Sequence, residues 1–161
     1  PASQDSVDSK SRYARREFEM RSIRTLLEKK GTHVWSIRPE ATVFEAVQEM
    51  AKKEIGALPV MDGEELVGII AERDYARRII LKERASKETR VDEVMTRKVV
   101  CAKPSQQIEE CMAIMMNGKF RHLPVMEDNK VIGVISLRDL VKTVIAEQQF
   151  TIEQLESYIA G

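Results

Sequence analysis

Apolar positions along the chain follow first a helical and then a strand pattern. Beyond residue 40, apolar side chains recur three or four positions apart, as on one face of an amphipathic helix: Val43, Ala46, Val47, Met50 and Ala51. Two short apolar runs follow, ALPVM and ELVGII, separated by the acidic turn sequence DGE. We expect these runs to form a β-hairpin. A second helix is expected from about Arg73 to Glu83.

The same order of elements occurs again in the second half of the chain. Residues 33–77 align with residues 98–142 without a gap, and both copies contain LPVM. The hairpin runs recur as HLPVM and KVIGVI around EDN, and a closing helix is expected from about Arg138 to Gln149. A short strand is expected before each amphipathic helix, HVWSI at 33–37 and KVVCA at 98–102. The helical positions recur as Ile108, Cys111, Met112, Met115 and Met116.

Each copy is therefore predicted to be a β-α-β-β-α repeat, which gives a mixed α+β fold class. A unit of this size buries too little surface to stand alone, so the two copies should pack sheet to sheet with pseudo-twofold symmetry. We expect a flexible tail over residues 1–16 and an N-terminal helix over 17–31 that Gly31 ends. The first repeat is assigned to 32–84, a linker to 85–96, the second repeat to 97–149 and a C-terminal helix to 150–161. Thr42 and Glu45 fit a capping box.

Charge and composition narrow the functional classes. The 161 residues carry 26 basic and 26 acidic side chains, so no overall field attracts nucleic acid or an anionic membrane. No apolar run approaches the roughly 18 residues that span a bilayer, and no signal-peptide pattern opens the sequence, so we expect a cytoplasmic protein. Cys101 and Cys111 fit no disulfide framework or zinc spacing and are expected to be inert core residues.

A strand-to-helix junction with the same chemistry ends both hairpins, GIIAERDY at 68–75 and GVISLRDL at 133–140. A carboxylate at such a junction can accept hydrogen bonds from two adjacent hydroxyls, the arrangement of a ribose diol, which makes Asp74 and Asp139 candidate ribose ligands. The N–H groups and dipole of the following helix favour a phosphate beside that ribose. The alternative is that each Asp only stabilises the first turn of its own helix.

These tandem segments resemble the CBS domain, the module named after cystathionine beta-synthase, and two copies over residues 32–145 resemble a Bateman module. GALPVMDGEELVGIIAERDYAR and RHLPVMEDNKVIGVISLRDLVK carry the resemblance. It implies two clefts that bind adenosine-containing ligands, with AMP first and ADP, ATP, NAD(H) or S-adenosylmethionine as alternatives. It further implies a homodimer that regulates an unidentified partner protein, in redox or energy signalling, rather than an enzyme.

The family's ligand motif, Gly followed by Ser or Thr and then Asp at fixed spacing, matches Gly133, Ser136 and Asp139. Adenine would lie against apolar residues of both repeats: Val34, Trp35 and Ile55 for one cleft, and Val99, Cys101 and Phe120 for the other. The further ligand-binding residues that the resemblance implies are Gly56, Ala57, Pro59, Arg73, Asp74, Thr96, Arg121, His122, Ile135 and Arg138.

The two copies differ at the junction itself. Ala71 and Glu72 occupy the positions that Ser136 and Leu137 occupy in the second copy. The first junction therefore lacks a hydroxyl and has an extra negative charge where a phosphate would bind.

A second difference lies at the start of the middle strand, where Gly56 and Ala57 replace Arg121 and His122. We therefore expect the Asp139 cleft to bind a phosphorylated adenosine ligand, and the Asp74 cleft to be empty, weaker or selective for a less charged ligand. Two other functions stay open: a structural dimerisation module with vestigial clefts, and an enzyme acting on nucleotides. The sequence has no P-loop and no metal-spaced histidine pair, which disfavours the enzyme and a metal site.

Overall fold

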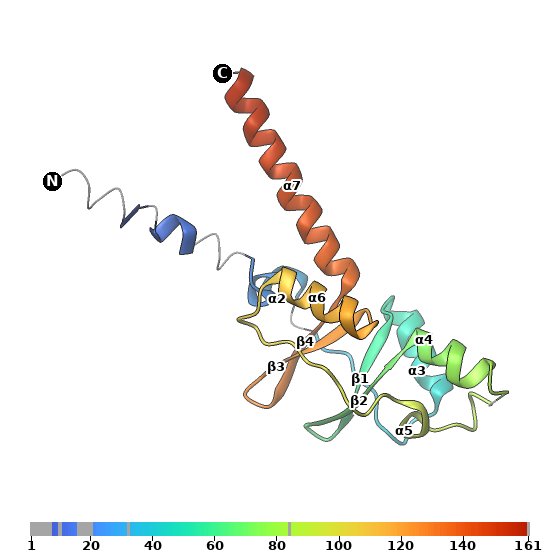
Figure 1. Cartoon of the computed structure of the whole chain (residues 1–161). Coiled ribbons are helices and arrows are strands. Elements are labelled where there is room, and N and C mark those ends of the chain that lie inside the picture. Colours follow the sequence, from blue (N-terminus) through green and yellow to red (C-terminus); the bar gives the residue numbers. More distant parts are fainter. Residues whose placement is uncertain (1–7, 10, 16–20, 32, 84, 161) are drawn as a thin grey trace. The chain divides into compact units, whose positions relative to one another are not determined.

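The computed structural model describes residues 8–9, 11–15, 21–31, 33–83 and 85–160. The flexible tail predicted over 1–16 is helical at its described residues, 8–9 and 11–15, so that part of the prediction was wrong. The rest of the tail and residues 17–20 of the helix predicted over 17–31 lie outside the described residues, and the described part of that helix begins at Ile23. The chain forms two compact units. Figure 1 labels the helices and strands that belong to them. One unit contains the described parts of 1–32, 102–121 and 135–161, and the other contains those of 33–101 and 122–134.

The 33–101 unit is built around the first hairpin. Helix α3 (Val43–Lys53) precedes antiparallel strands β1 (Ala57–Asp62) and β2 (Glu65–Ala71). A short α4 (Glu72–Asp74) continues into the π-helical turn η1 (Tyr75–Ile80), and α5 (Val91–Val94) follows. The buried core of this unit comprises Val43, Ala46, Met50, Leu58, Val60, Ile70, Ile79, Val91, Val94 and Met95.

Local sequence signals account for the bounds of α3. The Thr42 N–H donates to Glu45 Oε2 over 2.9 Å, and the Glu45 N–H donates to Thr42 Oγ1 over 3.2 Å, so the predicted capping box is confirmed. Glu54 ends the helix in the left-handed conformation, with φ of 55°. Three of the expected apolar positions, Val43, Ala46 and Met50, are buried.

The second repeat has matching elements. Helix α6 (Ile108–Gly118) precedes strands β3 (His122–Glu127) and β4 (Lys130–Ser136), which form a second two-stranded sheet. Asp128 and Asn129 at its turn have φ of 51° and 60°, as a type I′ turn requires, so the predicted hairpin is confirmed. Lys119 ends α6 with φ of 57°, at the position corresponding to Glu54.

Helix α2 (Ile23–Lys30) joins α6 through the backbone. The Ser22 side chain caps α2, and Gly31 ends it with φ of 101°, as the sequence predicts. The Ile23 N–H donates to the Gln106 carbonyl over 2.9 Å, and the Ile108 N–H donates to the Arg21 carbonyl over 3.1 Å. These bonds fix the end of α2 relative to the second repeat.

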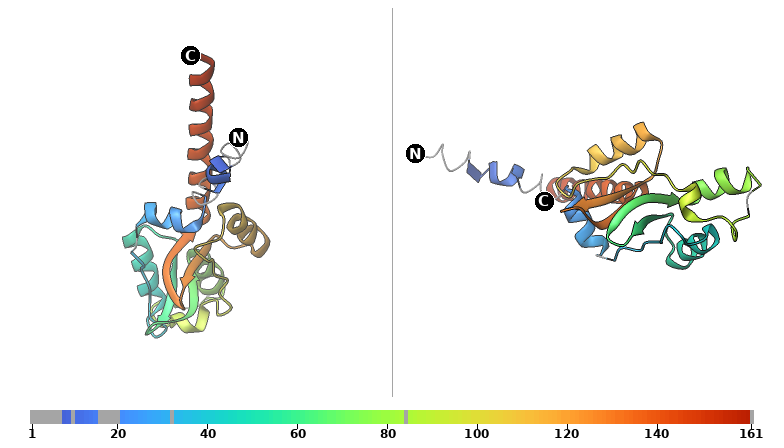
Figure 2. Two further views of the ribbon diagram at one scale, coloured as in Figure 1. Left: turned by 90° about the vertical axis from the view of Figure 1, so that its left-hand side faces the viewer. Right: turned by 90° about the horizontal axis from the view of Figure 1, so that it is seen from below.

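Two further expectations about secondary structure were wrong. The strands expected at 33–37 and 98–102 are not formed. Each segment contains one bridge residue, Ile37, which pairs in parallel with Val60, and Ala102. The chain turns at Pro39, so the pairing cannot extend beyond Ile37 toward the C-terminus. The helices expected to end near Gln149 and to begin at 150 are one continuous helix, α7 (Leu137–Ala160), because no Gly or Pro interrupts it (Figures 1 and 2).

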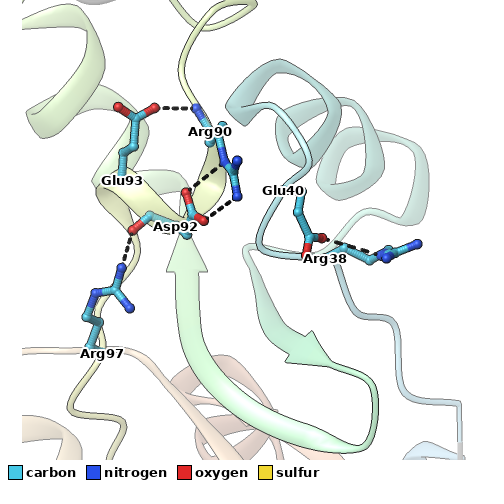
Figure 3. A network of polar contacts seen from close by, with 6 residues as sticks. All are labelled: Arg38, Glu40, Arg90, Asp92, Glu93 and Arg97. Atoms are coloured by element: carbon cyan, nitrogen blue, oxygen red, sulfur yellow. Dashed lines mark hydrogen bonds and ion pairs between the residues drawn. The ribbon is translucent and has the colours of Figure 1, made fainter.

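The segment between the repeats is folded. The Val91 N–H donates to the Ala41 carbonyl over 2.8 Å, and the Asp92 N–H donates to the Pro39 carbonyl over 3.0 Å, which attaches α5 to the start of α3. Figure 3 shows the charged side chains around this attachment, with the Arg90 guanidinium facing the Asp92 carboxylate at 2.7 Å. Exposed ion pairs of this kind stabilise little, so the backbone bonds and the buried Val91 hold the segment.

The close approach of residues 95–96 to strand β2 explains why residue 68 is glycine. Gly68 in β2 lies opposite Val60, and a Cβ there would overlap Met95 Sδ and lie 3.0 Å from the Thr96 carbonyl oxygen. The neighbouring Ile69 and Thr96 exchange backbone hydrogen bonds of 2.9 and 3.0 Å. Glycine is therefore required at 68 for the 95–96 segment to pair with β2.

Candidate functional site

The junction at Ser136 and Asp139 is a closed hydrogen-bonded turn. The Ser136 N–H donates to Asp139 Oδ2 over 2.8 Å, and the Asp139 N–H donates to Ser136 Oγ over 3.1 Å. This reciprocal arrangement is a capping box at the start of α7. The Leu137 N–H donates to the Arg121 carbonyl over 2.8 Å, which attaches the turn to the residue before β3.

A third group from outside the repeats reaches this carboxylate. Lys30, the last residue of α2, places Nζ 2.6 Å from Asp139 Oδ2. Burial by itself would raise the pKa of Asp139, but the hydrogen bonds from Lys30 and from the Ser136 N–H, together with the Lys30 charge, lower that pKa below its usual value. Asp139 is therefore a half-buried carboxylate that is ionised at neutral pH.

The corresponding turn of the first repeat has the same backbone hydrogen bonds, but different side chains contact its aspartate. The Ala71 N–H donates to Asp74 Oδ2 over 2.9 Å, and the Glu72 N–H donates to the Gly56 carbonyl over 3.0 Å. On the other oxygen, Arg78 Nε lies 3.7 Å from Asp74 Oδ1. No side-chain cap replaces the Ser136 hydroxyl, because the residue at this position is alanine.

The oxygen atoms of the two carboxylates are thus used differently. All contacts described for the Asp139 carboxylate end on Oδ2, so Oδ1 accepts no hydrogen bond from the described residues. At Asp74, a described group lies near each oxygen. A ligand hydroxyl would find an available acceptor at Asp139 and would have to compete with Arg78 at Asp74.

The backbone of each turn offers less to an anion than its position at a helix N-terminus suggests. At the second turn, the N–H groups of Ser136, Leu137 and Asp139 all donate within the protein. A phosphate there would depend mainly on side-chain donors, and Ser136, Lys30 and the exposed Arg138 are the groups nearest in the chain or in space. The expected anion site at this helix start stays a prediction.

His122 lies beside the first repeat's turn. A Cβ on Gly56 would be 3.1 Å from His122 Cε1 and Nε2, and 3.8 Å from Glu72 Oε2. The imidazole therefore packs over Gly56, which is possible because that residue has no side chain. The sequence left open which cleft His122 serves, and this contact places it near the Glu72 to Asp74 turn.

The residues predicted to contact adenine have distinct surroundings. The Trp35 indole is 38% exposed, stacks on His33 with centroids 5.0 Å apart, and has Lys53 Nζ 3.9 Å from its centroid. Phe120 lies over the end of α6, where a Cβ on Gly118 would overlap its ring. Half-buried residues among the candidates are Val34, Ile55, Thr96, Val99 and Cys101.

Other candidates are part of the core or lie at the surface. Ala57, Pro59, Gly133 and Ile135 are buried, so they shape the strands next to the turns. Arg121 is exposed, and Arg73 is half-buried. Every residue in the predicted ligand set stays a prediction at this point. Lys30 was not among them, because nothing in its local sequence signals a contact with a residue 109 positions away.

A pocket elsewhere in the chain has different chemistry. An open pocket of about 680 Å³ lies beside α3, lined by residues including Arg38, Glu40, Glu45 and Glu49, and is far more acidic than a phosphate site would be. Within the described residues, no group of His, Cys, Asp or Glu side chains could hold a metal ion. No helix there is long and apolar enough to cross a membrane.

The duplicated fold and its two junctions define the class of protein. The family model of the CBS domain matches residues 30–81 and 91–146, and the chain belongs to the CBS domain family as a tandem pair. The mixed α+β fold class and the sequence-based resemblance are confirmed.

Two relatives show the similarity over most of their own length. The chain is 36% identical over 154 residues to the CBS domain-containing protein CBSX3, mitochondrial, of Arabidopsis thaliana, covering 89% of this chain and 74% of the relative. It is 50% identical to a CBS-domain protein from Burkholderia ambifaria MC40-6, with a TM-score of 0.75, covering 81% of this chain and 96% of that chain.

A more distant structure shares the fold alone. The CBS domain pair of protein MJ0100, solved in complex with 5′-methylthioadenosine and S-adenosyl-L-methionine, is 23% identical with a TM-score of 0.69. It covers 78% of this chain and 97% of that chain.

Proposed function

We propose that this CBS pair is a regulatory sensor that binds an adenosine-containing nucleotide at the Asp139 turn and thereby modulates a partner protein. The observation that carries the proposal is the Asp139 carboxylate: it is ionised, half-buried and held by the Ser136 N–H and Lys30, with Oδ1 facing no donor among the described residues. A ribose diol supplies two hydroxyl donors to such a group. The proposed role as a sensor is supported by this binding chemistry and by the membership of the chain in the CBS domain family.

The phosphate preference of the site rests on side chains. Lys30 carries a positive charge within 2.6 Å of the carboxylate, the Ser136 hydroxyl can still donate its proton, and Arg138 is one residue away. At the first turn, Glu72 stands where Leu137 stands in the second, which adds a like charge to an incoming phosphate. We therefore assign the phosphorylated ligand to Asp139, with a weaker or different ligand at Asp74.

AMP is the first candidate, followed by ADP, ATP, NAD(H) and S-adenosylmethionine. The bound methylthioadenosine and S-adenosylmethionine of the MJ0100 pair support an adenosine moiety as the common element in this fold. We further propose that the protein is a homodimer, that it is not an enzyme, and that ligand occupancy shifts the population of conformations that the partner recognises.

A structural dimerisation module is the second candidate, and one observation favours it. Both aspartates already cap their own helices, through the Ser136 and Ala71 N–H groups, and this alone accounts for their presence. In that case the clefts would bind nothing, and the chain would only associate with itself.

Thermal unfolding with and without ligand separates these functions. Wild type, Asp139→Asn and the matched control Asp74→Asn are each melted with AMP, ADP, ATP, NAD⁺, NADH and S-adenosylmethionine. Asparagine retains an oxygen that can accept the capping hydrogen bond, so both variants should fold. Ligand at about 100 times its dissociation constant should stabilise by about 2.7 kcal/mol.

A shift lost in Asp139→Asn and retained in Asp74→Asn is the expected result. A shift lost only in Asp74→Asn contradicts the assignment of the sites, and no shift with any compound favours the dimerisation module. Conversion of the nucleotide during incubation, measured by chromatography, would instead identify an enzyme.

A further inference from the structure

The second half of α7 presents large apolar side chains that nothing in the described chain covers. Every residue from 148 to 160 is exposed. Ile145 is 59% exposed, Leu155 58% and Ile159 83%. The helix is continuous over this stretch (Figure 1), and its start is held by the buried Leu140. An amphipathic helix with an uncovered apolar stripe is stable in water only with a partner for that stripe.

The spacing of the stripe identifies the kind of partner. Positions alternate four and three residues apart, which is the a and d pattern of a coiled coil: Val141, Ile145, Gln148, Ile152, Leu155 and Ile159. Only Gln148 is polar. A seam with this period packs against another helix, since each side chain inserts between four residues of the facing helix.

We propose that α7 pairs with α7 of a second copy of this chain in an antiparallel coiled coil centred near Phe150. In this register Ile145 of one copy packs on Leu155 of the other, and Val141 packs on Ile159. Gln148 lies opposite Ile152 near the midpoint, where Gln149 and Thr151 can bond its amide. In this register every seam residue has a partner on the other helix, so neither end of the stripe is left uncovered.

The charged residues beside the seam favour the antiparallel orientation of the two helices. Lys142 and Glu156 both occupy the e position and lie nearly the same distance on either side of the centre. An antiparallel pair brings Lys142 of each copy beside Glu156 of the other, so two attractive contacts form by symmetry. In a parallel pair the two charges would stay about 21 Å apart along the axis, from their 14-residue separation at 1.5 Å per residue.

Disulfide formation between introduced cysteines tests this interface directly in the 161-residue chain. Two exposed positions of one layer are used, Ile145→Cys on one chain and Leu155→Cys on a second, differently tagged chain, and the two are expressed together. Each variant is also expressed alone, and wild type controls for Cys101 and Cys111. After mild oxidation, the covalent dimer is measured on non-reducing gels.

The proposal requires a mixed disulfide between the two tagged chains and little covalent dimer from either variant alone. Adding Lys142→Glu to both chains should lower the yield several-fold, and adding Lys142→Glu with Glu156→Lys should restore it. Covalent dimers of a single variant alone would indicate a parallel pair and overturn the proposal. So would absence of any covalent dimer, as expected if another protein, a membrane or the chain's own N-terminal segment covers the stripe. None of these outcomes depends on ligand binding.

Discussion

Replacing Lys30 with methionine tests whether the contact between α2 and the Asp139 turn stabilises the folded chain. The two charged atoms are 2.6 Å apart, but the Lys30 side chain is 40% exposed and that of Asp139 is 24% exposed. Water screens a pair of this exposure, so its contribution to the free energy of unfolding should be about 0.5–1 kcal/mol, in the range of exposed pairs. Methionine retains most of the apolar stem, which limits the loss of packing.

The pH dependence of this contribution follows from the lowered pKa of Asp139. Burial opposes ionisation, but the Lys30 and Ser136 hydrogen bonds outweigh it. A carboxyl whose folded pKa is depressed contributes stability that is present above its unfolded pKa of about 3.9 and is lost as the pH falls through the folded pKa. The coupling between Lys30 and Asp139 should therefore be full at neutral pH and should decline in acid.

A double-mutant cycle measures that coupling without the capping contribution of Asp139. Urea unfolding of wild type, Lys30→Met, Asp139→Asn and the double variant is compared at about pH 7 and about pH 3. Lys29→Met is the matched control, because Lys29 also lies in the last turn of α2. A coupling of zero at neutral pH, or one that is unchanged in acid, would refute this reasoning.

Three further outcomes are expected. Ser136→Ala should lower the free energy of unfolding by about 1 kcal/mol through loss of the cap, and Ala71→Ser should raise it, both measured by urea unfolding; equal effects of one sign would contradict the capping account. Gly68→Ala should cost about 1–3 kcal/mol by the same method, because its Cβ would meet Met95 and the adjacent carbonyl, and a neutral change would contradict the close approach. Burial raises the pKa of Cys111 to about 11, so its alkylation at about pH 8 should be slow in the native protein and fast in urea; rapid native alkylation would show that the thiol is accessible.

Short-range signals predicted most of the fold. The capping box at Thr42, the end of α2 at Gly31 and both hairpin turns depend on neighbours within a few residues, and all appear as expected. The strands at 33–37 and 98–102 were predicted from short local segments and did not form as strands, because pairing depends on long-range neighbours that local sequence does not specify.

The candidate site likewise has some features that local sequence predicts and others that depend on tertiary packing. The duplicated aspartates and the Ser136 hydroxyl are visible as a repeated motif, and the capping geometry follows from their spacing. The contact from Lys30 spans 109 positions from outside the repeat, so no comparison of the two copies could reveal it. The position of His122 over Gly56 also depends on tertiary packing. Sequence identified the carboxylates but not the groups that decide which one has an available oxygen.

The central claim, that the Asp139 carboxylate receives the ribose diol of a nucleotide, is tested most directly by calorimetric titration with AMP and with its 2′,3′-dideoxy analogue. Hydrogen bonds to a charged group contribute about 1.5–3 kcal/mol, so wild type should bind the analogue roughly 10- to 150-fold more weakly. Asp139→Asn should bind AMP weakly and discriminate much less between the two, while Asp74→Asn should behave as wild type at the Asp139 site. Equal affinity of the wild-type protein for AMP and its dideoxy analogue would contradict the account.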